Sequence, residues 1–286
     1  MQPQSIAIIG ADGHVGRHLA TCAEEAGLVV RKLGRYDDIS AALGGVDAVI
    51  HLAGTLQATG GNTYEAANVE TVKRTTAAAA EAGVQRVVFL SYVGADPRAK
   101  NAYLRTKGEA EELLRASRLD VIVLRSTFIF GPPTDPGPSI IPFVQTDGKP
   151  VSVVGSGTQR YQPVYVEDVA RALLGALHRD IVAGTYALSG PDVMSVDDLV
   201  ALVNGGGVKE RHLVGLAARA AAAIAPSLTQ AMVGVLSADS LPDVPLAWSA
   251  LGLQPTPMQQ VYAGDRFTPA ESDTATAIKH APKARA

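Results

Sequence analysis

The sequence predicts an α/β fold, in which helices cover both faces of a doubly wound parallel sheet and a small C-terminal lobe follows. Short apolar runs alternate with longer helical patterns over the first two thirds of the chain. A glycine-rich turn joins the first apolar run to the first helical pattern, and a loop rich in proline and glycine interrupts the alternation at residues 131–138. Apolar strands separated by helices indicate a parallel sheet, and right-handed crossovers favour the doubly wound order.

The individual elements follow from the positions of these runs. Strands are expected at residues 6–9, 28–33, 48–52, 86–90 and 121–125, and helices at residues 14–26, 62–82 and 101–118. Beyond the proline-rich loop, a strand at 164–166 and a helix at 168–177 are expected to return to the same sheet.

Composition and charge narrow the classes of function. The 286 residues are 47% hydrophobic and 19% charged, with 28 Gly, which is enough for a substantial core. The net charge of -3 and the lack of a Lys/Arg-rich block in the part expected to fold argue against a nucleic-acid partner. The single Cys22 and the absence of a Cys/His cluster with metal spacing predict no disulfide and no metal site. With no leader-like start, we expect a cytoplasmic bacterial protein, or one peripheral to the inner membrane.

Gly10, Gly13 and Gly16 lie between the first expected strand and the first expected helix. In a Rossmann-type domain such glycines allow a tight turn, a close approach of a pyrophosphate and close packing of the helix on the sheet. The helix N-terminus adds free N–H groups and the positive end of its dipole. We therefore predict a nicotinamide-dinucleotide site here. Its further expected contacts are Asp12, His14 and Val15 in the turn and Leu52, Ala53 and Gly54 after the third strand.

The end of the second strand is expected to contact the adenosine ribose. It carries Arg35, whereas the acids Asp37 and Asp38 come later. A guanidinium pairs with a 2′-phosphate, so the sequence favours NADP(H) over NAD(H), with Arg31 or Lys32 assisting. The alternative is that these cations are simply solvated at a strand end.

Tyr103 and Lys107 lie four residues apart, on one face of an expected helix. In such a pair a lysine cation lowers the pKa of the phenol and bonds the nicotinamide ribose, while the phenol transfers a proton at a carbonyl or carbinol. We therefore expect Tyr103 to act as acid or base with Lys107 as its partner. His51 is expected to be a packed core histidine.

Together these motifs resemble the short-chain dehydrogenase/reductase superfamily, in its extended and atypical, epimerase/dehydratase-like branches. The resemblance covers about residues 5–265 and is carried by the glycine spacing, residues 47–54, Asn68, Tyr103 with Lys107, and residues 125–132 and 163–170. It implies that Asn68 belongs to the cofactor site. It also implies a catalytic Ser or Thr after the strand that precedes the tyrosine helix. Ser91 lies in that segment, but Val93 stands where the extended enzymes carry the hydroxyl.

Within the atypical branch the chain is more closely similar to the NADPH-binding accessory subunit of respiratory complex I and its free-standing bacterial relatives. Residues 91–96, 103–111, 162–170 and 251–258 carry this similarity. Because turnover is not established for that subunit, the similarity implies cofactor binding more firmly than catalysis.

An apolar segment at residues 213–236 contains one charge, Arg219, and one helix breaker, Pro226. We expect two short helices, at 213–225 and 227–236. They either cap the substrate cleft or form a surface that contacts a membrane or a respiratory complex, or holds a quinone-like ligand. The side chains expected to line the substrate site are Val93, Phe128, Arg160 and Gln162.

We accordingly assign residues 1–189 to an NAD(P)-binding domain, with an excursion at 131–162 toward the substrate cleft. Residues 190–267 are assigned to a small, mostly helical C-terminal substrate lobe, and residues 268–286 to a disordered tail.

Two functions are compatible with the sequence. The leading hypothesis is an oxidoreductase or epimerase that acts by hydride transfer on a hydrophobic carbonyl, quinone-like or sugar-type substrate. The alternative is a non-catalytic NADPH-binding accessory protein of a respiratory complex I or quinone pathway. Val93 favours the alternative, and the intact pair of Tyr103 and Lys107 favours the enzyme.

Overall fold

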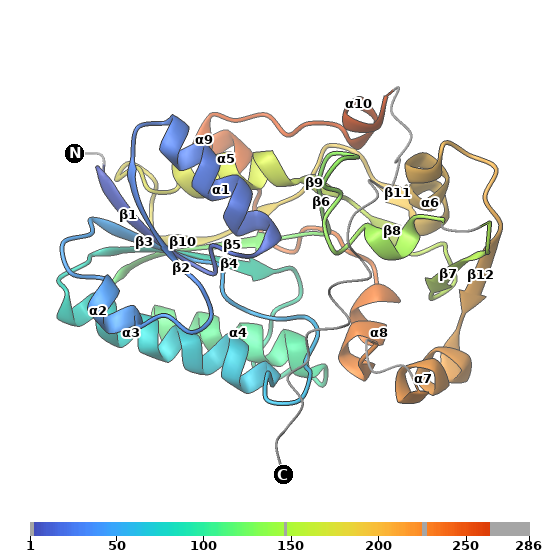
Figure 1. Cartoon of the computed structure of the whole chain (residues 1–286), viewed down its shortest axis with the longest axis horizontal. Helices are drawn as coiled ribbons and strands as arrows, with labels where there is room; N and C mark the ends of the chain where they lie inside the picture. The colour runs from blue at the N-terminus through green and yellow to red at the C-terminus, as the bar shows by residue number, and fades with distance from the viewer. Residues whose placement is uncertain (1–2, 146–147, 225–227, 264–286) are drawn as a thin grey trace, which may run out of the picture.

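The computed structural model, which describes residues 3–145, 148–224 and 228–263, is built on a six-stranded parallel sheet (Figure 1). The order across the sheet is β10-β5-β4-β3-β1-β2. The strands are β1 (Ser5–Ile9), β2 (Val29–Leu33), β3 (Ala48–His51), β4 (Arg86–Tyr92), β5 (Asp120–Ser126) and β10 (Gly184–Leu188). The order reverses at β1, so a crevice opens between the carboxyl ends of β1 and β3, where ligands bind in doubly wound sheets.

Helices cover both faces of the sheet, as Figure 1 shows. One face carries α1 (His14–Glu25), α5 (Val166–Gly175) and α9 (Trp248–Leu251), and the other carries α2 (Ile39–Ala42), α3 (Thr71–Glu81) and α4 (Ala102–Arg115). Successive residues of β1 enter the two different cores: Ile6 and Ile8 join the first, Ala7 and Ile9 the second. The prediction of a doubly wound α/β sheet is confirmed.

Two predictions about the sheet are wrong. The strand expected at 164–166 is β9 (Val164–Tyr165), which pairs with β6 (Ile129–Phe130) instead of joining the central sheet. The sixth place is taken by β10, an edge strand that was not predicted. An edge strand has a neighbour on one side only, and the first three residues of β10 are only partly buried, so it lacks a continuous apolar run. The helix expected at 62–82 begins as a π-helix, η1 (Glu65–Glu70), before α3.

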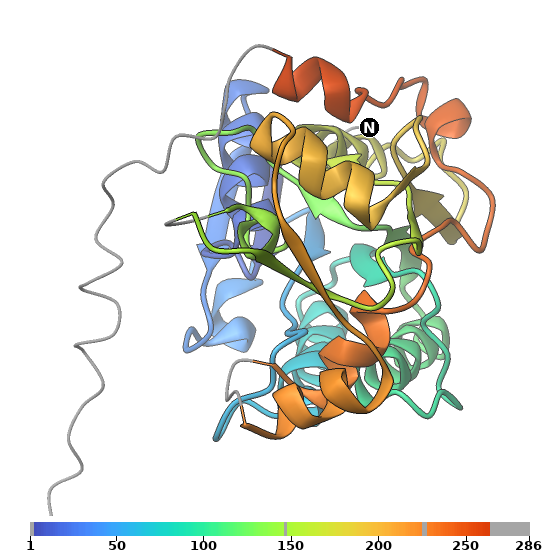
Figure 2. The same cartoon turned by 90° about the vertical axis from the view of Figure 1, so that its right-hand side faces the viewer.

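A third apolar core lies beyond the carboxyl ends of the strands, and Figure 2 views this part face on. Its members include Phe130 and Val153 from one part of the chain and Val196 and Met258 from another. The elements around it are η2 (Ile141–Phe143), β7 (Val151–Val154), β8 (Arg160–Tyr161), β11 (Met194–Ser195), α6 (Val196–Asn204), β12 (Glu210–Leu213) and α10 (Met258–Tyr262). Segments from before and after residue 189 pack together in this core, and α9 lies against α5 of the sheet domain. The domain boundary at residue 189 stays a prediction.

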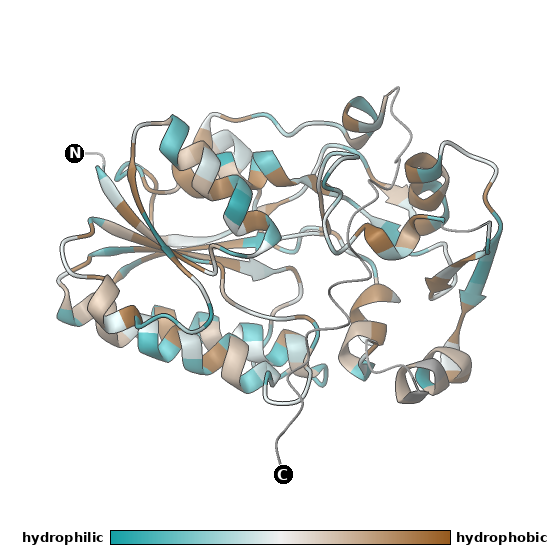
Figure 3. Cartoon of the chain, in the orientation of Figure 1, coloured by the Kyte–Doolittle hydropathy of each residue, from teal (hydrophilic) through white to brown (hydrophobic). Residues whose placement is uncertain are grey.

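The apolar segment near the end forms two helices, α7 (Gly215–Ile224) and α8 (Gln230–Leu236). Leu216 of α7 keeps 83% of its surface exposed. Figure 3 shows that apolar residues otherwise gather along the central strands and on the helix sides turned toward them. Among the described residues, no helix is both long and apolar enough to cross a bilayer. The expected tail at 268–286 lies outside the described residues.

Candidate active site

The glycine turn after β1 has two positions at which the surrounding protein excludes any side chain. Gly10 has a φ of +92°, and a Cβ there would lie 2.8 Å from the backbone nitrogen of Ala53. A Cβ on Gly16 would lie 2.3 Å from the carbonyl oxygen of Gly10. These two glycines therefore let the turn pack against the end of β3 and let α1 pack against the turn.

Gly13 faces open space instead. A Cβ on it would meet a single atom nearby, the carbonyl oxygen of Gly10 at 3.3 Å. Gly13 is also the N-cap of α1, and no side chain caps the N–H groups of the first turn. Such N–H groups bind anions, and a dinucleotide pyrophosphate fits this unobstructed helix start.

A cavity of about 640 Å³ begins at this turn. Of the predicted cofactor residues, it is lined by Gly10, Asp12, Gly13, Arg35, Leu52, Ala53 and Gly54. His14, Val15 and Gly16 do not line it, and a cofactor contact through their backbone N–H groups in the first turn of α1 stays a prediction. The side chain of His14 is turned toward Asp135 instead.

The far end of this cavity has a second arginine that sequence reasoning missed. Arg74 of α3 lines the cavity together with Arg35, and neither forms a hydrogen bond or ion pair with another described residue. The expected helpers are engaged elsewhere: Arg31 donates to the carbonyl oxygens of Ala42 and Gly44, and Lys32 pairs with Glu24. Nothing in the local sequence links Arg74 to Arg35, because only the packing of α3 brings them to one cavity.

A second cavity, of about 440 Å³, shares Leu52 and Gly54 with the first and contains Tyr103 and Lys107. Its wall toward α8 consists of Met232, Val235 and Leu236. The expectation that the apolar segment 213–236 caps the cleft therefore holds for α8, whereas α7 contributes no residue to this cavity.

Lys107 is buried at the floor of the second cavity. Its Nζ donates a hydrogen bond to the carbonyl oxygen of Leu90 at 2.7 Å and lies 4.1 Å from the centre of the Phe89 ring. Burial lowers the pKa of Lys107 to about 7, although Glu111 opposes the shift. A lysine with this pKa changes its charge close to neutral pH.

Asn68 of η1 lies beside this lysine. Its Oδ1 accepts a hydrogen bond from the backbone N–H of Thr55 at 2.9 Å, and its Nδ2 donates to Thr106 Oγ1 at 2.9 Å. A Cβ on Gly54 would lie 2.8 Å from Asn68 Oδ1 and 3.9 Å from Lys107 Nζ. Asn68 and Lys107 thus both face Gly54, the residue at which the two cavities meet.

Tyr103 lies among aromatic rings on the same wall. The ring centres of Tyr92 and Tyr64 are 5.7 and 6.3 Å from its own, and its hydroxyl has no hydrogen-bond partner among the described residues. Burial, reinforced by these two phenols, raises the pKa of Tyr103 far above its ordinary value. The expectation that Lys107 lowers this pKa is wrong, because burial disfavours the charge of both groups.

Ser91 has its hydroxyl committed to a buried network. Its Oγ donates to Glu111 Oε1 at 2.6 Å, and Arg125 donates to both oxygens of the same carboxylate, at 2.9 and 2.8 Å. Arg115 completes the partners of Glu111. Ser91 therefore lies in the cavity wall with its proton already donated elsewhere, and a direct contact with substrate stays a prediction.

Of the four residues expected to line the substrate site, one lines the second cavity and three do not. Phe128 lines the second cavity. Val93 is buried behind the wall, Arg160 is an exposed partner of Asp239 at 2.8 Å, and Gln162 donates to the carbonyl oxygen of Gly190 at 2.8 Å. These three do not line the cavity. For Arg160 and Gln162 the reason is that β8 and the residue after it face the third core and the surface instead.

His51 is a core histidine, as predicted. Its Nδ1 lies 3.0 Å from Thr75 Oγ1, and its Nε2 has no partner among the described residues. Complete burial lowers the pKa of His51 to about 3, so the ring is neutral at physiological pH.

An anion-binding glycine turn that leads along one crevice to a tyrosine and a lysine defines a dinucleotide-binding protein of the short-chain dehydrogenase/reductase class. The model of the NAD dependent epimerase/dehydratase family matches residues 6–187, and the chain belongs to that family.

Its relatives include both respiratory-chain subunits and an enzyme. The chain is 30% identical over 192 residues to NADH dehydrogenase [ubiquinone] 1 alpha subcomplex subunit 9 of Arabidopsis thaliana, a match that covers 65% of this chain and 48% of the relative. It is 28% identical to the ceramide reductase of Caulobacter vibrioides, with 64% of each chain covered. The chain thus spans about half the length of the first relative and less than two thirds of the second.

Solved structures agree on the fold. MoeE5 in complex with UDP-glucuronic acid and NAD superimposes with a TM-score of 0.71 at 24% identity, over 91% of this chain and 96% of its own. The UDP-glucose 4-epimerase of Thermus thermophilus gives a TM-score of 0.69 at 20% identity, over 90% and 96%.

Proposed function

We propose that the protein is an oxidoreductase that uses NADP(H) to reduce a hydrophobic carbonyl substrate, with Tyr103 as proton donor and Lys107 as its partner. The observation that carries the proposal is the state of Tyr103. Its hydroxyl has no partner among the described residues, lines a cavity with an apolar wall, and has a raised pKa. A protonated phenol with no other hydrogen-bond partner can donate its proton to a developing alkoxide, which is the step that a carbonyl reduction needs.

The protein's own residues divide the work along the crevice. The first-turn N–H groups of α1, next to Gly13, would hold the pyrophosphate. Lys107 and Asn68 face Gly54, which lines both cavities. The bound cofactor supplies a hydride. Tyr103 then places its proton on the reacting oxygen, and the α8 wall excludes water from this end.

The choice of NADP(H) rests on Arg35 and Arg74. These two arginines, without hydrogen-bond or ion-pair partners among the described residues, line the first cavity. They offer charge-assisted bonds to a 2′-phosphate. The carboxylate of Asp12 lies near Gly34 in the same region, and the carboxylate of Asp37 accepts from the Gly34 N–H at 2.7 Å. The two arginines attract a 2′-phosphate and the two carboxylates repel it, so a comparison of NADPH and NADH binding measures which effect is larger.

The substrate class follows from the wall of the second cavity. Met232, Val235, Leu236 and Phe128 present apolar surface to it. The hydroxyls of Ser91 and Thr127, which also lie there, donate to other protein groups. Such a wall favours a lipid-like or quinone-like carbonyl over a sugar nucleotide, and the name ceramide reductase of the Caulobacter relative agrees with a lipid substrate.

A second candidate function is a non-catalytic NADPH-binding accessory protein. It is supported by the commitment of Ser91 to Glu111, by the burial of Val93, and by the relatives named as complex I subunits. The protein would then be cytoplasmic, and the exposed apolar side chain of Leu216 on α7 would offer a contact with a respiratory complex or with the inner membrane. In this case the cofactor stabilises the fold and is not turned over.

The Tyr103→Phe variant separates the two functions. The enzyme should oxidise NADPH with long-chain ketones, ketosphingoid bases or quinones, and the variant should lower the rate by about 10²–10⁴ with NADPH affinity unchanged. Tyr92→Phe is the matched control, since that phenol lines the same cavity but already bonds Ser240 Oγ at 3.0 Å. Tight NADPH binding without turnover across this panel would reject the enzyme and support the accessory protein.

A further inference from the structure

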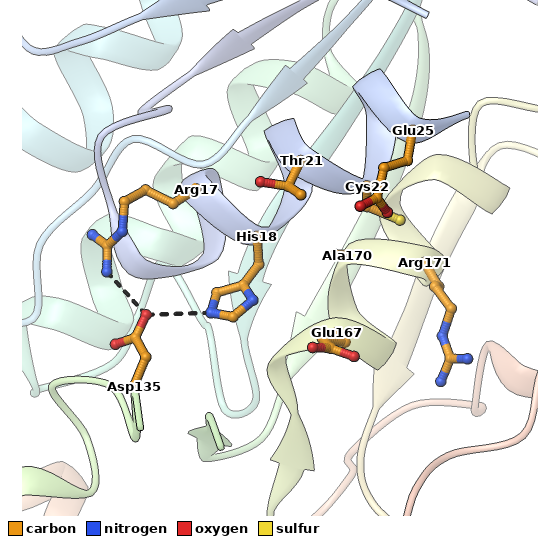
Figure 4. A pocket seen from close by; sticks show the side chains of 9 residues that line it. All are labelled: Arg17, His18, Thr21, Cys22, Glu25, Asp135, Glu167, Ala170 and Arg171. Carbon is orange, nitrogen blue, oxygen red and sulfur yellow. Dashed lines mark hydrogen bonds and ion pairs between the residues drawn. The ribbon is translucent and has the colours of Figure 1, made fainter. Parts of the chain in front are cut away.

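Two histidines and an aspartate converge at the start of α1, outside the two cavities described above. His14 and His18 are one helical turn apart, and Asp135 comes from the loop at residues 131–138. His14 Nε2 lies 3.7 Å from Asp135 Oδ1, and His18 Nε2 lies 3.4 Å from Asp135 Oδ2. Figure 4 shows the ring of His18 and the guanidinium of Arg17 both reaching this carboxylate.

The spacing of these three groups suits a small cation. One donor atom from each lies within 4.8 Å of the other two. Bonds of about 2.0–2.2 Å from Zn²⁺ to nitrogen and oxygen place neighbouring donors of a tetrahedral site roughly 3.3–3.5 Å apart. Two imidazoles and a carboxylate are a ligand set that first-row transition metals accept. We infer that His14, His18 and Asp135 form a binding site for a divalent transition-metal ion such as Zn²⁺, with a fourth position open to water.

The loop is shaped around the His14 ring. A Cβ on Gly131 would lie 2.9 Å from His14 Nε2, and a Cβ on Gly137 would lie 2.4 Å from His14 Cε1. The carbonyl oxygen of Asp135 also lies 3.2 Å from His14 Nε2. Because a carbonyl oxygen only accepts, Nε2 carries the ring proton in this contact, and an ion bound at Nε2 takes the place of that proton. The ring is thus held in place next to Asp135.

A metal ion has a route to this site from solvent. A cavity of about 570 Å³ opens beside the cluster and is lined by His18, Asp135, Glu167 and Cys22 among others (Figure 4). Arg17 competes with a metal ion for the Asp135 carboxylate, because its Nη2 lies 3.2 Å from Asp135 Oδ2. Its side chain is 56% exposed, so it can swing into water when an ion takes the carboxylate.

An ion at this site would fasten the loop to α1 at the end of the helix that holds Gly13. The same stretch of chain continues to Pro138, Ser139 and Pro142, which line the cavity of Tyr103. The metal site is therefore joined through a few residues to the wall of the reaction cavity. Its existence does not depend on whether that cavity catalyses a reaction.

The test is calorimetric titration of ZnCl₂ into untagged, chelator-stripped protein near neutral pH. We expect one equivalent to bind. Since loss of an outer-shell partner alone costs about 10–100-fold in metal affinity, His18→Ala and Asp135→Asn should each cost at least as much. Arg17→Gln should bind more tightly, because it removes the competing cation. Affinity should fall in acid, because protons compete with the ion for imidazole nitrogens and carboxylate oxygens.

Two controls identify the donors. Cys22→Ser tests the thiol one turn beyond His18 in the same cavity, and His212→Ala removes the other histidine–acid cluster, with Asp197 and Glu210. Both should bind Zn²⁺ like the parent protein. Unchanged binding by a folded His18→Ala variant, or loss of binding in either control, would overturn the assignment. Circular dichroism and dinucleotide binding confirm that each variant is folded.

Discussion

Lys107 should give the free energy of unfolding a dependence on pH that a methionine in its place removes. Burial brings the pKa of Lys107 from 10.5 to about 7 in the folded protein, whereas the unfolded chain keeps the ordinary value. Between these two pH values the unfolded chain binds the proton and the folded protein does not, so stability rises with pH across the window. Below about pH 7 both states are protonated, and the residue adds no slope.

The size of the effect follows from the one-proton difference. The slope is at most about 1.4 kcal/mol per pH unit. From pH 7 to pH 9 the free energy of unfolding of the parent should therefore rise by roughly 2 kcal/mol relative to that of Lys107→Met. The methionine also leaves the carbonyl oxygen of Leu90 without its donor, which adds an offset that does not change with pH. Because both proteins share all other titrating groups, the difference isolates Lys107.

The measurement is urea unfolding of both proteins at several pH values between about 6 and 9, with Cys22 kept reduced. Lys73→Met is the matched control, because Lys73 is an exposed lysine whose raised pKa keeps it charged throughout this range. A flat difference between the parent and Lys107→Met would mean that the buried ammonium stays charged. Lys107 would then act on Tyr103 as a cation, and the explanation that burial removes the charge of Lys107 would fail.

Three further predictions test the cofactor site and the core. Gly13→Val should abolish dinucleotide binding, because its side chain fills the open space above the turn; near-parental titration of a folded variant would place the cofactor elsewhere. Arg35→Ala and Arg74→Ala should each weaken NADPH by about 1–3 kcal/mol and leave NADH unchanged, and equal losses for both cofactors would remove the basis for NADP(H). The unfolded chain protonates His51 below about pH 6.5 while the folded protein, with a pKa of about 3, does not, so stability falls as pH falls. His51→Leu should show a shallower acid slope in urea unfolding, and an unchanged slope would contradict the buried neutral ring.

The parts of the fold that were predictable are those whose cause is local. β1, β3 and β4 lie inside the sheet and read as continuous apolar runs, so their positions were found to within two residues. β10 pairs with one other strand, β5, and is bridged on its far side by Leu246 alone among the described residues; the sequence does not reveal it and places β9 in the wrong sheet. Periodicity shows that a segment is buried, but it carries no information about which neighbour buries it.

The same distinction applies to the candidate site. The glycine turn and the pair of Tyr103 and Lys107 are set by spacing within one turn or one helix, and the sequence shows them. Arg74 and Met232 reach the cavities only through the packing of α3 and α8. The sign of the pKa shift at Tyr103 could not be read from spacing, because it depends on burial against Tyr92 and Tyr64.

The Ser91 hydroxyl is committed to Glu111, so under the proposed function, with Tyr103 as proton donor, we expect a substrate to be oriented chiefly by the shape of the cavity. Hydrogen bonds of one side chain, Asn101, connect α4, which carries Tyr103, to α8, which forms the apolar wall. Asn101 caps α4 by accepting from the backbone N–H of Tyr103 at 3.0 Å, and its Nδ2 donates to the carbonyl oxygen of Ala231 in α8 at 2.9 Å. A Cβ on Gly234 of α8 would lie 2.6 Å from that same Nδ2, so the helices approach closely because this residue has no side chain. The helix that forms the apolar wall is therefore tied through Asn101 to the backbone of Tyr103, the proposed proton donor, so we expect a ligand that displaces α8 to displace Tyr103 with it.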